Sequence, residues 1–168
     1  TAGKRQAFDD PRGQAMLKFA DLVNEVQPKV FLLENVRGLL SSALKHVPIK
    51  ERENRKLKPD EKPGSALRYL LSLFRDYNVK VKLLNAADYG VAQTRERVFI
   101  VGVRNDLNIN YNFPEATHDK EGRNDKKPWR KVGEVLNKIN VEKHNHLNYS
   151  AERLKWMKMI PKAGGNWR

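Results

Sequence analysis

Cysteine is absent from the 168 residues of this protein. Its absence excludes disulfide bonds, thiolate-bound zinc and a thiol nucleophile from these residues, and it is typical of an intracellular protein. The sequence also has no apolar stretch long enough to span a bilayer, and its first residues lack the pattern of a signal peptide. We therefore expect neither a disulfide framework nor a membrane partner.

Acidic residues are few compared with basic ones: there are 20 Asp and Glu against 33 Lys and Arg, and the formal net charge is +13. The basic residues are spread along the chain instead of forming one tail, which favours a folded surface that binds phosphates. A charged surface also keeps any protein soluble. Charge alone therefore indicates a polyanionic partner such as nucleic acid without deciding it.

Apolar residues recur at helical spacing between Arg12 and Gln27 and predict a helix. Its expected inner stripe is Ala15, Met16, Phe19, Leu22, Val23 and Val26. The wholly apolar run from Val30 to Leu33 predicts a strand covered on both faces, as in a parallel sheet. A second helix is predicted from Ser65, as its N-cap, to about Tyr77, with Leu67, Leu70, Leu71 and Phe74 facing inward.

Alternation of apolar residues with lysines over Val79–Leu83 predicts a strand with one solvent-exposed face, near a sheet edge. Residues 98–103 predict a further strand that pairs with it antiparallel. The order of elements indicates an α/β fold with a mostly parallel sheet and this antiparallel edge pair. The charged segment His46–Pro63 is expected to be an exposed loop, most simply a linker. Further helices are expected near residues 132–139 and 150–160.

Two polar residues, Glu34 and Asn35, directly follow the first apolar strand. Ligands of open α/β sheets bind at the carboxyl ends of strands, so this pair is a candidate site. Two plainer interpretations stay open: Glu34 caps the following turn, or it pairs with Arg37.

A second polar cluster precedes and enters the strand at residues 98–103. Gln93, Arg95 and Arg97 alternate, so their side chains are expected on one side of the chain. Guanidinium groups offer planar forks of donors to phosphate and carbonyl oxygens. The alternative is that they are merely exposed charges on an edge strand.

Together these clusters resemble a family. Glu34-Asn35-Val36 resembles the Glu-Asn-Val motif of bacterial-type cytosine-5 DNA methyltransferases, and Gln93–Arg97 resembles their Gln-x-Arg-x-Arg motif. The stretches at 85–91 (NAADYGV) and 8–13 (FDDPRG) are similar to segments that these enzymes carry in the same order. The resemblance spans most of residues 5–104. It implies the second half of a Rossmann-like, S-adenosylmethionine-dependent methyltransferase domain.

The resemblance also implies a reaction. Enzymes of this family flip a cytosine out of duplex DNA, add a cysteine thiolate to C6 and transfer a methyl group from S-adenosylmethionine to C5. Glu34 would hold N3 and the exocyclic amine, and Arg95 and Arg97 would hold O2 and neighbouring phosphates; these three are the expected catalytic residues. The expected contacts with DNA are Arg12, Asn35 and Gln93. The expected contacts with the cofactor are Gln14 and Ala15, and no metal is expected.

Two features of the family are missing from this sequence: the Pro-Cys nucleophile loop and the Gly-rich cofactor loop. We therefore interpret the residues as an internal portion of a restriction-modification methyltransferase of the bacterial cytoplasm and nucleoid. We expect this portion to be inactive alone and to be completed from the same gene or by a complementing chain. Residues 1–112 are expected to belong to the catalytic domain, and residues 113–168 to lead into the target-recognition region.

Two other functions remain open: a non-catalytic nucleic-acid-binding module of the same fold, and a transfer-RNA cytosine-5 methyltransferase. His144-Asn145-His146 reads HNH in one-letter code, which is the name of a nuclease family. The further metal ligands that such a nuclease site needs are not evident in the sequence. Trp129, Trp156 and Trp167 are able to stack on bases, although packing is the expected role of at least two of them.

Overall fold

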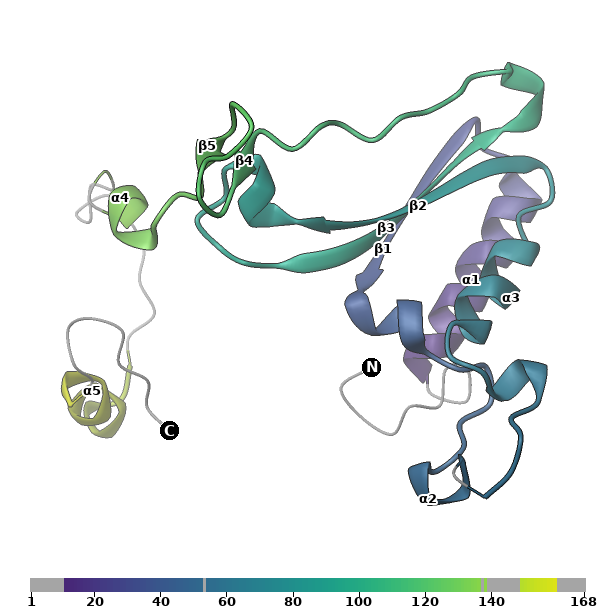
Figure 1. Ribbon diagram of the computed structural model, residues 1–168, viewed down its shortest axis with the longest axis horizontal. Coiled ribbons are helices and arrows are strands. Elements are labelled where there is room, and N and C mark those ends of the chain that lie inside the picture. The colour runs from purple at the N-terminus through teal and green to yellow at the C-terminus, as the bar shows by residue number, and fades with distance from the viewer. Residues whose placement is uncertain (1–10, 53, 137, 139–148, 160–168) are drawn as a thin grey trace. The chain divides into compact units, whose positions relative to one another are not determined.

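The computed structural model describes residues 11–52, 54–136, 138 and 149–159 (Figure 1). The chain divides into two compact units, of which the first ends at Val132 and the second begins at Gly133. The first unit carries the sheet, the core and all of the predicted site residues.

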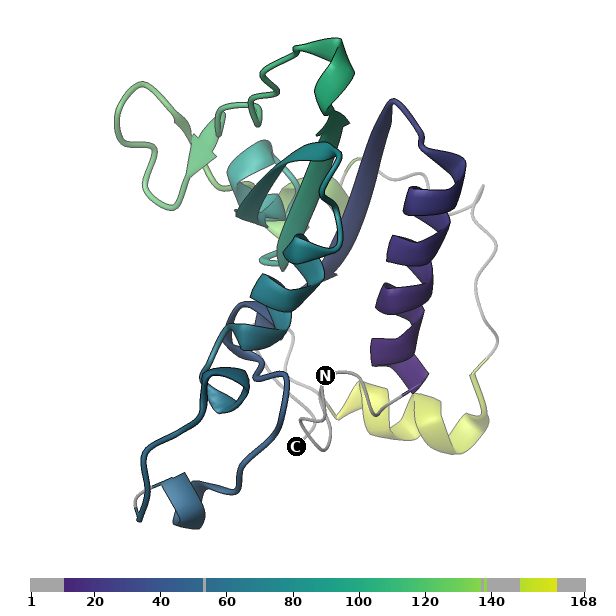
Figure 2. The same cartoon turned by 90° about the vertical axis from the view of Figure 1, so that its right-hand side faces the viewer.

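Helix α1 (Pro11–Val26) confirms the helix predicted there. Proline at its first position suits a helix start, because that residue needs no N–H partner. The inner face is narrower than the predicted stripe: Met16, Ala20 and Val23 are buried, whereas Leu22 and Val26 are 54% and 63% exposed. Figure 2 shows α1 and the following strand, joined by a short turn, running side by side in opposite directions.

The sheet has three strands, β1 (Val30–Val36), β2 (Tyr77–Asn85) and β3 (Glu96–Arg104), in the order β1-β3-β2. Both neighbours pair antiparallel with the central β3. The antiparallel pair of the second and third strands is confirmed, but a mostly parallel sheet is wrong for the described residues. The cause is that the chain returns from β2 through residues 86–95, and β3 then lies between β1 and β2, which run in the same direction without pairing with each other.

Strand β1 is longer than predicted and is exposed on one face. Phe31 is 5% exposed, whereas Val30 and Leu32 are 52% and 59% exposed, so the expectation of cover on both faces is wrong within the described chain. Glu34 and Asn35 lie inside this strand and not beyond its end. Because successive strand residues face opposite sides, Glu34 points to the exposed face and Asn35 to the helix side.

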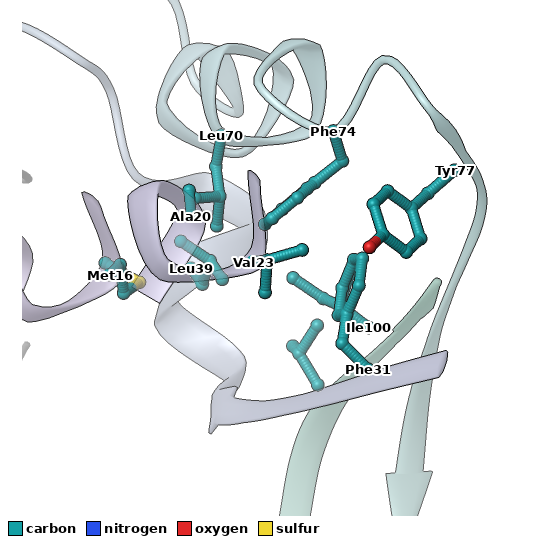
Figure 3. Packing of buried hydrophobic residues seen from close by; sticks show 10 residues of the cluster. Met16, Ala20, Val23, Phe31, Leu39, Leu70, Phe74, Tyr77 and Ile100 are labelled. Carbon is teal, nitrogen blue, oxygen red and sulfur yellow. The ribbon is translucent and has the colours of Figure 1, made fainter. Parts of the chain in front are cut away.

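One hydrophobic cluster joins α1, α3 (Ser65–Ser72) and the inner face of the sheet (Figure 3). The Phe31 ring centroid lies 4.4 Å from that of Phe74 and 5.1 Å from that of Tyr77. Gly102 stands opposite Phe31, and a Cβ atom there would approach Phe31 Cε1 to 2.1 Å. Glycine at this position therefore lets the ring lie directly on the sheet. Helix α3 ends at Ser72, before the predicted Tyr77, which instead begins β2.

Between β1 and α3 the chain forms η1 (Arg37–Ser41), α2 (Ile49–Arg52) and η2 (Pro59–Glu61). This region is exposed as expected, but it is a folded projection and not a plain linker. Figures 1 and 2 show α2 projecting beyond the ends of α1 and α3.

After β2 come η3 (Ala86–Tyr89), then β3 and η4 (Asn105–Leu107), and then a two-residue parallel pair, β4 (His118–Asp119) with β5 (Lys127–Pro128). Helices α4 (Val132–Leu136) and α5 (Ala151–Lys158) confirm the two late helices over the residues described. Among the described residues, no helix has the length and apolarity required to cross a membrane.

Candidate functional site

A carboxylate lies between two guanidinium groups on the exposed face of the sheet. Arg97 Nε lies 2.8 Å from Glu34 Oε1, and a terminal nitrogen of Arg95 lies 3.8 Å from the same oxygen. The side chains of Glu34, Arg97 and Arg95 are 44%, 23% and 50% exposed, so the group is accessible to a ligand. The structure thus brings together the three residues that were predicted to be catalytic.

The strand register explains this grouping. Glu34 stands opposite Phe99 and Val36 opposite Arg97, so Glu34 and Arg97 are diagonal neighbours on one face of an antiparallel pair. Long side chains reach across such diagonals. Since β3 is the central strand, the alternative of idle charges on an edge strand does not apply to Arg97.

Asn85 holds the loop from which Arg95 projects. Its Oδ1 atom accepts hydrogen bonds from the backbone N–H of Ala87 at 3.2 Å and of Arg95 at 3.0 Å. The Ala86 N–H also donates to the Arg95 carbonyl at 3.0 Å, which closes the loop at its base. Sequence reasoning gave Asn85 no role of its own. The sequence did offer an indication of this role. An asparagine at the end of a strand often accepts a hydrogen bond from the backbone N–H two residues later.

Arg37 has a different partner from the one considered from the sequence. Its guanidinium lies 2.8 Å from Glu96 Oε2, on the residue before Arg97. Glu34 is therefore bound by Arg97 and Arg95, and the alternative in which it pairs with Arg37 is wrong. The N-cap of η1 is Val36 and makes no side-chain cap hydrogen bond, so Glu34 does not cap that turn.

The remaining predicted contacts lie apart from this group. Asn35 is on the helix side, where its Nδ2 donates to Met16 Sδ at 3.1 Å and its Oδ1 accepts from the Val36 N–H at 2.8 Å. Gln93 is exposed in the loop before β3. Gln14 and Ala15 are exposed on α1; Arg12 is in the first turn of that helix. The assignments of these residues stay predictions. No cluster of metal-ligating side chains occurs among the described residues.

The segment after Phe113 packs on η3, beside the loop that carries Arg95. Trp129 Nε1 donates to Asp88 Oδ1 at 2.9 Å, and the Tyr89 hydroxyl donates to the Pro114 carbonyl at 3.1 Å. Trp129 is thus partly buried and held by a hydrogen bond, and packing by at least two of the three tryptophans stays a prediction. Trp156 is 56% exposed, whereas Trp167 and His144-Asn145-His146 lie outside the described residues.

The group offers an acceptor and donors side by side. A carboxyl group accepts from an amine, and a guanidinium donates to a carbonyl or phosphate oxygen. A planar ring that carries an amine, a ring nitrogen and a carbonyl along one edge presents the complementary pattern. Such a surface is able to bind a pyrimidine by its edge.

Comparison with known proteins agrees with this chemistry. The sequence matches the C-5 cytosine-specific DNA methylase family over residues 1–166. It is 37% identical over 163 residues to the type II methyltransferase M.FnuDI of Fusobacterium nucleatum, covering 89% of this chain and 42% of that protein. It is 33% identical over 165 residues to the type II methyltransferase M.NgoFVII of Neisseria gonorrhoeae, covering 96% of this chain and 39% of that protein.

A third relative is M.MthTI of Methanothermobacter thermautotrophicus, also a type II methyltransferase. It is 42% identical over 121 residues, which cover 71% of this chain and 31% of that protein. The chain thus spans less than half the length of these curated relatives. The family match over nearly the whole chain shows that this protein belongs to the C-5 cytosine-specific DNA methylases.

Proposed function

We propose that this chain is part of a DNA (cytosine-5-)-methyltransferase of a restriction-modification system. The complete enzyme transfers the methyl group of S-adenosylmethionine to C5 of a cytosine flipped out of duplex DNA. The observation that carries the proposal is Glu34 held between Arg97 and Arg95 on an accessible surface. The family description names DNA, which favours DNA over transfer RNA as the substrate.

The three side chains have complementary roles in holding the base. Glu34 accepts from the exocyclic amine of cytosine and shares a proton at N3, which relieves the negative charge that attack at C6 puts into the ring. Arg95 and Arg97 donate to O2 and to the neighbouring phosphates. Thymine has a carbonyl in place of the amine, and its oxygen would face the Glu34 carboxylate with no hydrogen between them, so the same three side chains disfavour thymine.

The other predicted residues complete the interface in this proposal. Arg12, Asn35 and Gln93 contact the DNA or support the loop that does. S-adenosylmethionine would supply an electrophilic methyl group, and we place the exposed Gln14 and Ala15 beside it, since the Gln14 amide gives both donors and an acceptor. They form only a small part of a cofactor site.

The nucleophile must come from outside these residues, because the 168 residues contain no cysteine. We place it, with the Gly-rich cofactor loop of a Rossmann-like domain, on a segment encoded in the same gene or on a complementing chain. Residues 113–168 lead into the region that reads the target bases. The proposed enzyme acts on DNA in the bacterial nucleoid.

The test is a Glu34→Gln substitution in the complete enzyme. Methyl transfer should fall by about 100-fold or more, because the amide cannot share the proton at N3, whereas affinity for DNA should change little. Steady-state transfer of labelled methyl and equilibrium DNA binding measure the two effects. Glu25→Gln, on an exposed residue of α1, removes the same charge and should leave both unchanged.

Equal losses of transfer and of affinity in the Glu34 variant would assign Glu34 a structural role. Unchanged transfer would show that Glu34 takes no part in the reaction, and an absence of transfer by the wild-type enzyme would support the non-catalytic binding module. Competition between duplex DNA and transfer RNA for the wild-type enzyme, at one fixed salt concentration, tests the choice of nucleic acid.

A further inference from the structure

Residues 45–62 form a closed projection from the first unit, here called the basic lobe. Its base is joined by the Lys45 N–H, which donates to the Asp60 carbonyl at 2.9 Å. Ser65, the first residue of α3, fastens this base: its hydroxyl donates to the Asp60 carbonyl at 2.7 Å and accepts from the Leu44 N–H at 2.8 Å. Val47, near this base, is 3% exposed. The lobe therefore has a defined fold.

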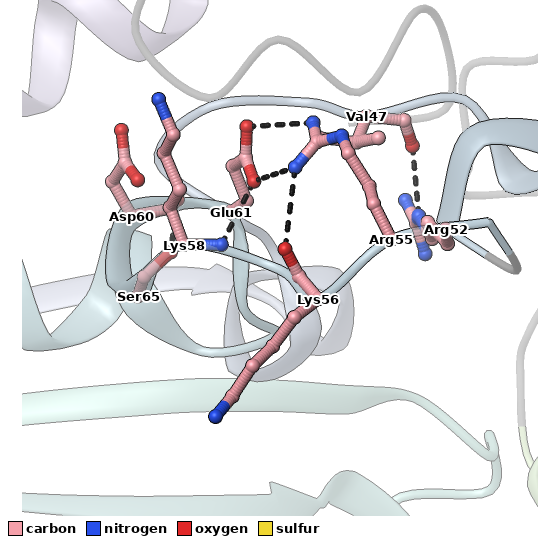
Figure 4. Close-up of polar contacts among 8 residues, drawn as sticks. All are labelled: Val47, Arg52, Arg55, Lys56, Lys58, Asp60, Glu61 and Ser65. Atoms are coloured by element: carbon pink, nitrogen blue, oxygen red, sulfur yellow. Dashed lines mark hydrogen bonds and ion pairs between the residues drawn. The ribbon is translucent and has the colours of Figure 1, made fainter.

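A buried carboxylate organises the interior of the lobe (Figure 4). Glu61 is 3% exposed and makes a bidentate pair with Arg55, at 2.7 and 2.9 Å. It also accepts from the Lys58 N–H at 2.9 Å. The Arg55 guanidinium, with its bond to Glu61 foremost, and the Lys58 N–H lower the pKa of Glu61 to about 2. One acidic residue of the lobe is thus turned inward and neutralised.

The remaining charge of the lobe is predominantly positive and faces solvent. The lobe holds seven Lys and Arg against four Asp and Glu, and the Arg55–Glu61 pair cancels one positive and one negative charge. The exposed cations are Lys45, Lys50, Lys56, Lys58 and Lys62. Among the ion pairs formed within the described chain, none involves a lysine. These ammonium groups are therefore available to an anionic partner.

A cavity of about 260 Å³ lies where the lobe meets η1. Its lining includes Ser41, Ser42, His46 and Arg52, and also Glu61, whose carboxylate is paired with Arg55. The Nε of Arg52 donates to the Val47 carbonyl at 2.7 Å, which fixes the guanidinium at the cavity wall. Guanidinium and imidazole groups are ligands of phosphate oxygens. The Ser41 and Ser42 hydroxyls donate to the Gly38 carbonyl, so the donors available to a phosphate are those of Arg52 and His46.

The lobe projects from the end of the sheet at which the base-binding group lies. Glu34 is two residues before the end of β1, and η1 continues directly from that strand into the lobe. Duplex DNA carries phosphates on both sides of any one nucleotide, so a basic projection at this end of the sheet is able to contact phosphates near a nucleotide bound at Glu34.

We propose that the basic lobe and the cavity at its base bind the phosphate backbone of duplex DNA next to the nucleotide held at Glu34. This inference rests on the proposed function for the identity of the polyanion. The contacts are with phosphates, which position the enzyme on the duplex and carry no sequence information.

The test measures binding of a short fluorescein-labelled DNA duplex to the 168-residue chain by fluorescence anisotropy, between about 50 and 200 mM KCl. The lobe variant is Lys50→Gln with Lys56→Gln. The matched control, Lys29→Gln with Arg75→Gln, also removes two exposed cations, at the far end of the sheet. The lobe variant should bind more weakly for every duplex sequence, and the slope of log affinity against log salt should be smaller by about 2. The control should match the wild type.

A wild-type chain that does not bind duplex DNA, or equal losses in the two variants, would overturn the inference. Circular dichroism shows whether each variant is folded, and both replace exposed side chains. The outcome is separable from that of the proposed function. Phosphate binding by the lobe is measured without methyl transfer, and a failure of Glu34→Gln to slow transfer would leave the binding result standing.

Discussion

Glu34 and Asn35 are neighbours in the sequence, yet β1 directs their side chains to opposite faces. From the sequence, both residues were predicted to follow the end of the strand and to form one candidate site. The strand continues to Val36, and its alternation separates the pair. Glu34 joins Arg97 and Arg95, while the Asn35 amide contacts Met16 and its own strand.

Asn85 should be a positioning residue for Arg95. In the complete enzyme, Asn85→Ala removes the acceptor of two backbone N–H groups, and the resulting misplacement of Arg95 should lower kcat for methyl transfer by about 10- to 100-fold. Asn85→Asp keeps the oxygen and should recover most of the rate. The measurement is steady-state methyl transfer with separate kcat and KM, and equal damage by the two substitutions would argue against this role.

At the scale of elements, the charged segment between β1 and α3 differs most from what its composition suggested. Lys, Arg, Glu and Pro over this stretch are typical of a solvated loop. The fold of the lobe depends on contacts between residues that are separated in sequence, such as Lys45 with Asp60 and Arg55 with Glu61. No periodic pattern in the sequence predicts these contacts. Ser65 was expected to cap α3, but Gly64 is the N-cap and Ser65 closes the lobe.

The buried pair in the lobe should make stability depend on pH. The pKa of Glu61 is lowered to about 2 from 4.5 by Arg55 and the Lys58 N–H. Because the pKa is lowered, the ionised carboxylate stabilises the folded state at pH values above its ordinary pKa. This contribution is lost as the pH falls from 4.5 towards 2. Glu61→Gln should therefore unfold at a lower temperature near neutral pH, and the difference from the wild type should shrink as the solution is acidified.

Thermal unfolding at about pH 6 and about pH 3 measures this difference. Glu25→Gln, on the exposed side of α1, serves as the control and should follow the wild type at both values. A gap between Glu61→Gln and the wild type that stays constant with pH would show that the carboxylate charge is not what holds the lobe.

For the whole molecule, the sheet order explains why a parallel sheet was expected but an antiparallel one was found. The sequence of helices and strands is that of an α/β protein, and such proteins usually have parallel sheets. Here β1 and β2 do run in the same direction, but β3 lies between them. The strand that separates them is also the one that delivers Arg97 to Glu34.

The 168-residue chain alone should transfer no methyl groups. It contains no cysteine, and the proposed reaction requires a thiolate that adds to C6. Incubation of the purified chain with DNA and labelled S-adenosylmethionine, followed by counting of the recovered DNA, checks this expectation. Incorporation above that of a protein-free sample would contradict the proposed mechanism. Addition of a segment that supplies the Pro-Cys and Gly-rich loops should restore activity.

The sequence by itself determined the family resemblance, the helices α1 and α3, the antiparallel pairing of β2 with β3, and Glu34, Arg95 and Arg97 as site candidates. The helices and the strand pairing follow from local periodicity, whereas the resemblance follows from the likeness of short motifs to those of the family, and these motifs include the site candidates. Only the tertiary structure decided the order β1-β3-β2, the face on which each polar residue lies, the role of Asn85 and the folded lobe around Glu61. Each of these depends on contacts between segments distant in sequence, which local patterns do not encode.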